Sequence, residues 1–310
     1  MISLKILGII TSMVFYRSLA QSVGCGRAAI DYRPTLNRHR IIGGREARPH
    51  SWPWMTFLSV DKANNQKILC AASLLRVNEE ERSDIVLTAA HCVTREETQG
   101  TSPVPYDLWR VSVLAGVHNR VQDTWNSQTR RAAKIVIRAD FRFLSQTGAS
   151  NDLAVVELDK PIDFTDTVRP VCLPNQSDDV PVGKVCIAAG WGRTSSYWTH
   201  FYSEILQQTL APAHDADVCT RAWAPVPFKE DQMICAGSLQ GSSGICNGDS
   251  GGQLACQESD GRWTLYGVSS FTIGSGRCVA TNKPAVFSRV SSYVDWITKQ
   301  ASDMSALSGK

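Results

Sequence analysis

Gly248-Asp249-Ser250-Gly251-Gly252 is the stretch of this 310-residue chain on which its interpretation depends. By itself, a run of glycines around two polar residues is typical of a flexible loop. Two other stretches lie upstream of it, Thr88-Ala89-Ala90-His91-Cys92 and Asn151-Asp152-Leu153-Ala154. Taken singly, the histidine could be an ordinary buried residue and the aspartate a turn residue before a strand. Taken together, the three stretches supply an imidazole, a carboxylate and a hydroxyl, the groups that nucleophilic catalysis requires.

The chain order of these groups indicates one class of enzyme. A hydroxyl is a poor nucleophile until a neighbouring base takes its proton, and a third group must hold that base in one tautomer. The order His91, Asp152, Ser250 is that of the chymotrypsin triad. With these motifs the chain resembles the chymotrypsin-like serine proteases from Ile41 to about Ala301. The resemblance implies an all-β fold of two packed six-stranded antiparallel Greek-key β-barrels (the trypsin-like serine protease fold) with a C-terminal helix.

The resemblance also implies a role for each residue of the motifs. His91 would be the general base and acid, Asp152 would orient its imidazole, and Ser250 would attack the scissile carbonyl. The backbone N–H groups of Gly248 and Ser250 would form the oxyanion hole. A rival hypothesis is a catalytically silent secreted homologue that binds partners through the same fold, but such proteins usually lack a triad member. A lipase or esterase would need the order Ser, Asp, His, which this chain does not have.

The pattern of apolar residues predicts the same fold class. From Ile41 onward, short apolar and β-branched runs alternate with Gly, Pro, Asn and Ser clusters, which is typical of a β-barrel or sandwich. Near the C-terminus, Val290, Tyr293, Val294 and Ile297 recur at helical spacing, with Ser291 or Ser292 as a cap. This is the one helix that the sequence predicts. The expected strands include Met55–Val60, Ile85–Thr88, Trp109–Leu114, Lys134–Ile137, Leu153–Leu158, Lys184–Ala189, Leu265–Phe271 and Ala285–Val290.

The N-terminus predicts secretion. Lys5 precedes an apolar stretch over residues 6–16, and small residues follow up to Ala20. We expect a signal peptide over residues 1–20, cleaved after Ala20. A membrane anchor is the alternative, but Arg17 ends the apolar run too early to span a bilayer of about 30 Å. Residues 21–40 are polar, which indicates a pro-segment or linker, and we expect residues 41–310 to form the protease domain of an extracellular protein.

Charge and composition exclude one class of partner and one class of protein. There are 32 basic and 29 acidic residues, so the net charge is +3, which is too weak to indicate nucleic acid binding. Hydrophobic residues make up 43% of the chain, which excludes an intrinsically disordered protein. We therefore expect protein or peptide substrates as partners, together with a trypsin-like activating protease and serpins or other protein inhibitors. No nucleic acid, membrane or cofactor is expected.

Ten cysteines remain after the predicted signal peptide. An even number in an oxidising compartment favours five disulfides, and no C-x-x-C pair with zinc-ligand spacing occurs. The count alone leaves the pairing open. The family resemblance implies a pairing in which the first bond ties the pro-segment to the domain: Cys25–Cys172, Cys70–Cys92, Cys186–Cys256, Cys219–Cys235 and Cys246–Cys278.

Arg40-Ile41-Ile42-Gly43-Gly44 matches the activation junction of the family. The resemblance implies that cleavage after Arg40 frees the α-amino group of Ile41, which then pairs with Asp249. Leaving a buried carboxylate without its partner costs about 3–5 kcal/mol, so this pairing can act as a switch.

The residues of the primary substrate pocket predict its preference. The resemblance places Gly244 at the pocket base, where trypsins carry an aspartate, and neither Gly244 nor Ala285 can neutralise a buried lysine or arginine. Thr272 and Ala285 stand where family members with wide pockets have glycines, and Ile245 adds bulk near the pocket floor. Ser270 matches the serine that supports the catalytic aspartate and lines the strand that binds substrate. We expect an elastase-like enzyme that cleaves after small or medium apolar residues such as Ala, Val or Leu.

Two further sequence features concern metal binding and glycosylation. The loop after Gly116 carries Val117 and Gln128 where calcium-binding members have carboxylates, so no metal site is expected there. The sequon Asn175-Gln176-Ser177 makes Asn175 a candidate glycosylation site.

Overall fold

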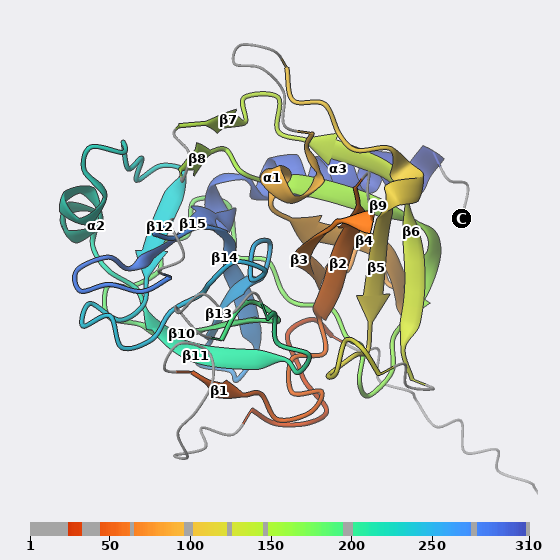
Figure 1. Cartoon of the computed structure of the whole chain (residues 1–310). Helices are drawn as coiled ribbons and strands as arrows, with labels where there is room; N and C mark the ends of the chain where they lie inside the picture. Colours follow the sequence, from red (N-terminus) through yellow and green to blue (C-terminus); the bar gives the residue numbers. More distant parts are fainter. Residues whose placement is uncertain are drawn as a thin grey trace, which may run out of the picture.

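The first half of the chain closes into a six-stranded antiparallel barrel in the order β2-β3-β4-β9-β6-β5, drawn on the right of Figure 1. Along β5, Val111, Val113 and Ala115 are buried and alternate with half-buried residues, because successive side chains of a strand point to opposite faces. The strands are β2 (Met55–Asp61), β3 (Lys67–Leu74), β4 (Arg82–Thr88), β5 (Val111–Ala115), β6 (Gln128–Ile137) and β9 (Ala154–Asp163).

The second half forms a seven-stranded antiparallel sheet in the order β1-β11-β10-β13-β14-β15-β12. A bridge between Ala213 and Ala236 joins the end of β11 to β12, so the sheet curls toward closure. The prediction of two β-barrels is confirmed, and β1 adds two residues to the edge of the second. These strands are β1 (Arg45–Glu46), β10 (Val185–Gly190), β11 (Gln207–Pro212), β12 (Met233–Ala236), β13 (Gln253–Gln257), β14 (Trp263–Phe271) and β15 (Ala285–Arg289).

This computed structural model describes residues 24–32, 44–62, 65–95, 102–122, 126–144, 148–194, 201–273 and 278–307. The predicted signal peptide, Arg40 and Ile41 lie outside the described residues. The predicted strand Trp109–Leu114 begins two residues later than expected: Trp109 and Arg110 belong to a 3-10 turn, η2 (Leu108–Arg110), because the Arg110 N–H donates to the carbonyl of Asp107 (2.9 Å).

The C-terminal helix, α3 (Val294–Leu307), is confirmed, but it begins later than predicted. Its expected cap residues instead form a 3-10 turn, η3 (Val290–Ser292). Ile297, Ala301 and Met304 bury one face of α3 against the first barrel, including β9. Among the residues that the structure describes, no helix is both long enough and apolar enough to span a bilayer.

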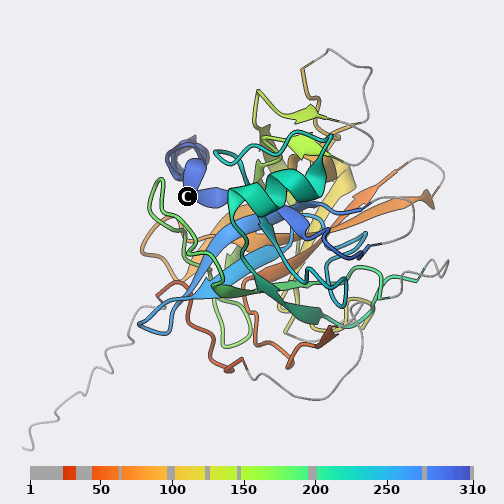
Figure 2. The same ribbon diagram turned by 90° about the vertical axis from the view of Figure 1, so that its left-hand side faces the viewer.

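Two other helices were not predicted, α1 (Ala90–Val93) and α2 (Ala216–Trp223). The carboxylate of Asp215 caps α2 by accepting a hydrogen bond from the Val218 N–H (2.7 Å). Figure 2, which views the molecule from the side of the second sheet, shows α2 in front of that sheet.

Two hydrogen bonds from tryptophan side chains connect the two barrels. The indole N–H groups of Trp52 and Trp54 donate hydrogen bonds to the side-chain oxygens of Gln208 (2.6 Å) and Gln253. Trp54 and Gln253 are both fully buried. The largest apolar cluster runs across this junction, from the first barrel into β10 and β14. The barrels therefore share a core at the place where the candidate site lies.

The described part of the predicted pro-segment, residues 24–32, packs on the domain. The Gly26 N–H donates to Pro170 O (2.8 Å), and the Trp263 N–H donates to Gly26 O (2.8 Å). Gly26 has a φ of +70°, and a Cβ there would lie 2.3 Å from the carbonyl oxygen of Trp263, so glycine is required. The ring of Tyr32 contacts those of Trp52 and Trp263 at centroid distances of 5.3 and 5.7 Å.

The structure contains five disulfides, with the pairs that the family resemblance implies. One joins the residue 24–32 segment to the domain, one adjoins His91, and one adjoins the Ser250 loop. The pairs are Cys25–Cys172, Cys70–Cys92, Cys186–Cys256, Cys219–Cys235 and Cys246–Cys278.

Candidate active site

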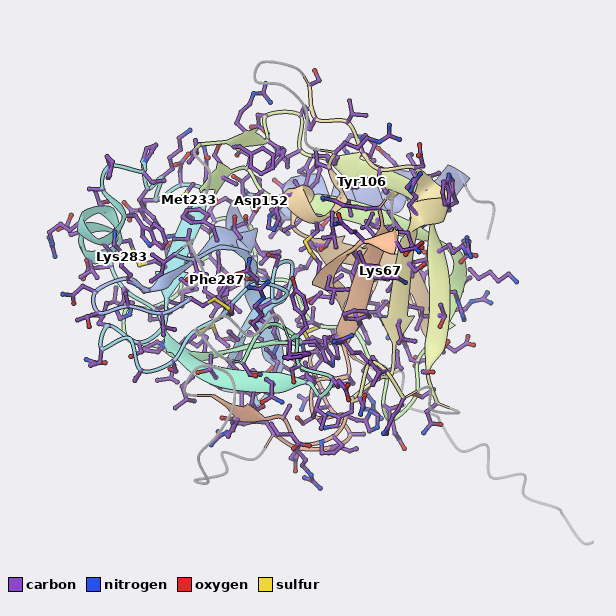
Figure 3. All side chains as sticks on the ribbon, in the orientation of Figure 1. Lys67, Tyr106, Asp152, Met233, Lys283 and Phe287 are labelled. Carbon is purple, nitrogen blue, oxygen red and sulfur yellow. A yellow bond between two sulfur atoms is a disulfide. The ribbon has the colours of Figure 1, made fainter. Side chains whose placement is uncertain are left out.

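The three motif residues come from three different elements. His91 lies in α1 directly after β4, and Asp152 lies two residues before β9. Ser250 lies in the loop between β12 and β13 of the second sheet. Asp152, labelled in Figure 3, lies between the two sheets. Because His91 and Ser250 line the same cavity, the fold brings the hydroxyl and the imidazole to one place.

The Asp152 carboxylate is held by three hydrogen bonds. His91 Nδ1 lies 2.7 Å from Oδ2, and the backbone N–H of His91 donates to Oδ1 (2.9 Å). The Ser270 hydroxyl also donates to Oδ2 (2.5 Å). With the carboxylate as acceptor, Nδ1 of the imidazole carries the proton, which leaves Nε2 free to accept one. This is the tautomer that a general base for a hydroxyl needs.

Electrostatics couple the two side chains. Burial alone would lower the pKa of His91, but the charge of Asp152 and its hydrogen bond outweigh burial and raise it. Burial alone would raise the pKa of Asp152, but the charge and hydrogen bonds of His91, together with the Ser270 hydroxyl, lower it. The carboxylate therefore stays ionised and stabilises an imidazolium next to it.

The loop that carries Ser250 has two glycines whose conformation excludes other residues. Gly248 has a φ of +96°, and a Cβ there would lie 2.7 Å from the ring of Tyr202. Gly251 has a φ of +77°, and a Cβ there would lie 2.2 Å from Ala71 O. Within the described part of the chain, the N–H groups of Gly248 and Ser250 have no backbone acceptor. Two adjacent free N–H donors beside a hydroxyl can bind an oxyanion.

Asp249 lies buried behind this loop. Its Oδ1 accepts from the Gly192 N–H (2.7 Å) and its Oδ2 from the Cys246 N–H (2.8 Å). Burial raises the pKa of Asp249 to about 6, although these two hydrogen bonds oppose the rise. A Cβ at Gly190 or Gly192 would lie 2.2 or 2.5 Å from the carboxyl group, so both glycines make room for it. No salt bridge within the described residues reaches Asp249, and its predicted partner Ile41 lies outside them.

A cavity of about 220 Å³ opens beside His91 and Ser250. Of the predicted pocket residues, Ile245, Ser270 and Thr272 line it. Gly244 and Ala285 are not among the lining residues: Gly244 faces Val279, and Ala285 packs with Ile245 in the core of the second barrel. Ile245, and not its neighbour Gly244, therefore contributes to the wall of this cavity. The described lining residues are His91, Phe143, Gly148, Ala149, Ile245, Cys246, Asn247, Ser250, Ser269, Ser270, Phe271, Thr272 and Ile273.

Sequence reasoning missed one wall of this cavity, which comes from the segment before Asp152. Phe143 of β7 (Arg142–Phe143), Ala149 of β8 (Ala149–Ser150) and Gly148 next to β8 line it, and the two strands form a small sheet of their own. Their place shortly before Asp152 was the available signal, since a segment that leads into the site must run past it. None of the described lining residues carries a carboxylate, so this part of the cavity offers no counter-charge to a lysine or arginine.

The other predicted sites are placed as follows. Asn175 is exposed in a turn, where its side-chain Nδ2 donates to Asp178 (2.9 Å). Among the described residues, the metal-ligating side chains that gather are Cys70, His91 and Cys92. The two sulfurs are bonded to each other, so neither is a thiolate ligand.

Comparisons with known proteins show which proteins this chain is similar to. The family model described as Trypsin matches residues 41–297. Chymotrypsin-C of Bos taurus is 35% identical over 294 residues, which cover 93% of this chain and 97% of that protein. Chymotrypsin-C of Rattus norvegicus is 34% identical over 284 residues (91% and 95%), and that of Mus musculus is 34% identical over 287 residues (91% and 97%).

Proposed function

Because the chain belongs to the trypsin family of serine endopeptidases, we propose that it is the secreted precursor of a protease with His91, Asp152 and Ser250 as its catalytic triad. The observation that carries this proposal is the Asp152 carboxylate, which is anchored by three hydrogen bonds and aligned on His91 Nδ1. The imidazole that it orients shares a cavity with the Ser250 hydroxyl.

The acylation step uses each of these groups. Ser250 Oγ attacks the carbonyl carbon of the peptide bond while its proton passes to His91 Nε2, and Asp152 stabilises the imidazolium. The N–H groups of Gly248 and Ser250 donate to the oxygen that becomes negative in the tetrahedral intermediate. His91 then gives the proton to the leaving nitrogen, the C–N bond breaks, and an ester on Ser250 remains.

In deacylation, water takes the place of the Ser250 hydroxyl as the nucleophile, and the same groups act again. His91 Nε2 takes a proton from a water molecule as its oxygen attacks the ester carbon. The same two N–H groups stabilise the second oxyanion. Collapse of this intermediate breaks the bond to Ser250 Oγ, which recovers its proton from His91. The new carboxylic acid then leaves, and the enzyme returns to its starting state.

We propose that cleavage after Arg40 by a trypsin-like protease activates the precursor. The freed ammonium of Ile41 would pair with Asp249, whose buried carboxylate has two N–H donors but no counter-charge among the described residues. The N–H groups of Gly192 and Cys246 hold this carboxylate, and Asp249 directly follows Gly248 in the chain. A movement of the carboxylate would therefore move Gly248 as well. The Cys25–Cys172 disulfide would keep residues 21–40 attached after residues 1–20 have been removed as a signal peptide.

The cavity supports cleavage after small or medium apolar residues. Ile245 and Thr272 narrow it, and no carboxylate lies among the lining residues that the structure describes. The discrimination that such a pocket gives is graded, at about 1–3 kcal/mol per methylene. The relatives' name, chymotrypsin-C, makes large apolar residues the rival preference. Peptide p-nitroanilides with Ala, Val, Leu, Phe or Lys before the cleaved bond test this proposal, and faster turnover of Phe or Lys would overturn it.

A serine-directed fluorophosphonate probe tests the triad itself. We expect labelling of the Arg40-cleaved protein, much weaker labelling of the precursor, and none of the Ser250→Ala variant. Absence of labelling in the cleaved wild type would instead support the catalytically silent homologue.

A further inference from the structure

The residue before Asp152 has an unusual backbone. Asn151 has a φ of +52°, in the left-handed region that non-glycine residues seldom occupy. Asparagine tolerates this region better than most residues, but it still needs support from its surroundings. Because Asn151 and Asp152 share a peptide group, the conformation of Asn151 determines the direction in which the Asp152 side chain leaves the backbone.

Both polar atoms of the Asn151 side chain are engaged. The Tyr293 hydroxyl donates to Oδ1 (2.7 Å), and Nδ2 donates to the backbone oxygen of Asp140 (3.0 Å). Asn151 is 8% exposed, so no bulk water competes for these bonds. A carboxamide held at both ends can take one orientation only, which stabilises the left-handed backbone next to it.

Tyr293 is itself fixed from two sides. It is buried between η3 and α3, and burial raises the pKa of its hydroxyl well above the ordinary value, so the group is a permanent donor. The guanidinium of Arg138 lies 5.2 Å from the Tyr293 ring centroid and 5.3 Å from that of Trp296. Arg138 also binds both carboxylate oxygens of Asp140 (2.9 and 2.8 Å). The start of the C-terminal helix thus connects to the backbone of the segment that carries Asp152.

We propose that Asn151 and Tyr293 are positioning residues, which aim the Asp152 carboxylate at His91 and act beside the bonds of Ser270 and Ser288. The Ser270 hydroxyl holds the carboxylate, and the Ser288 hydroxyl donates to the backbone oxygen of Asp152 (2.9 Å). This inference rests on the proposed catalytic role of Asp152. Without the Tyr293 hydroxyl, Asn151 relaxes, and the 2.7 Å contact between Asp152 and His91 is no longer enforced.

Three variants of the Arg40-cleaved protein test the proposal. Tyr293→Phe removes one hydroxyl and keeps the ring under Arg138, whereas Asn151→Gly keeps a residue suited to positive φ and removes both side-chain bonds. The third variant combines the two changes. The control is Tyr266→Phe, which removes the hydroxyl of another buried tyrosine, in the core of the second barrel.

We expect kcat to fall about fivefold for Tyr293→Phe, the effect of one lost hydrogen bond, with KM within about twofold of the wild type. Asn151→Gly loses about tenfold, and the double variant is no worse than Asn151→Gly because Tyr293 acts through Asn151. The acid limb of kcat/KM moves to lower pH in all three, since a misaligned carboxylate stabilises the imidazolium less. Tyr266→Phe keeps the wild-type kcat and acid limb.

Several results would overturn the proposal. One is a Tyr293→Phe enzyme with wild-type kcat and pH profile; another is a double variant whose losses multiply. Loss of urea stability with unchanged kcat would assign the contact a structural role only. If the cleaved wild type neither turns over substrate nor reacts with the fluorophosphonate, the proposed function fails and this inference fails with it. An active wild type with unaffected variants overturns the inference alone.

Discussion

Cleavage after Arg40 should change how the stability of the protein depends on pH, and Asp249 sets the size of the change. In the uncleaved chain, burial raises the pKa of Asp249 from 3.8 to about 6, a rise of about two units. One pKa unit corresponds to about 1.4 kcal/mol, so the protonated carboxyl is favoured by about 3 kcal/mol on folding. Between pH 4 and 6 the folded precursor holds a proton that the unfolded chain has lost, and stability therefore falls as pH rises through this window.

In the cleaved protein, Asp249 should no longer make stability fall as the pH rises. The ammonium of Ile41 favours the ionised carboxylate and lowers its pKa, so the loss of stability between pH 4 and 6 disappears. We therefore expect the free energy of unfolding of the cleaved form, relative to that of the precursor, to increase by about 3 kcal/mol from pH 4 to 6 and then to level off below the titration of the ammonium.

Urea unfolding under non-reducing conditions, followed by tryptophan fluorescence from pH 4 to 7, measures this difference. Both forms should carry Ser250→Ala, which prevents self-digestion. The matched control is Asp249→Asn, in which cleavage should leave the pH dependence unchanged. A difference between cleaved and uncleaved protein that stays constant over this pH range would refute the reasoning, because it would show that Asp249 does not exchange a proton for the ammonium.

Three further outcomes are expected. Asp152→Asn should lower kcat by about 10⁴-fold at neutral pH, because the amide no longer enforces the proton on His91 Nδ1; steady-state kinetics with a chromogenic peptide checks this, and a loss below tenfold would contradict the triad. Ile245→Gly should open the cavity and raise kcat/KM for a Phe substrate relative to an Ala substrate by at least about tenfold, and an unchanged ratio would show that Ile245 does not limit the pocket. Tyr32→Ala should lower the free energy of unfolding by about 2 kcal/mol through lost contacts with Trp52 and Trp263; an unchanged urea midpoint would mean that residues 24–32 are tethered without being packed.

The strands and the candidate catalytic residues could be predicted, because both depend on residues that are close together in the sequence. The strands follow from the apolar runs, and the three motif residues follow from their short signatures and their order. Helix α2 could have been found, because Asp215 is a standard capping residue and buried Cys219, Ala222 and Trp223 follow at helical spacing. Its eight residues, however, lie among turn-forming residues that also suit a loop.

Long-range contacts could not be predicted in this way. Trp54 and Gln253 are 199 residues apart, and nothing near either residue indicates that one will bond the other. The pocket shows the same limit: the position of Gly244 in the chain suggested its base, but Ile245 lines the cavity and Gly244 does not, which depends on how the whole second barrel packs. The positive φ of Asn151 likewise depends on a tyrosine 142 residues later.

The docked N-terminal segment has a practical consequence. Cys25 forms a disulfide with Cys172 on the protease domain, and the backbone N–H of Trp263 donates a hydrogen bond to Gly26 O. If the chain is cut after Arg40 as proposed, a reporter fused just ahead of Cys25 would therefore remain attached to the protease domain. On a gel the two pieces would migrate as one band until a thiol reagent separated them.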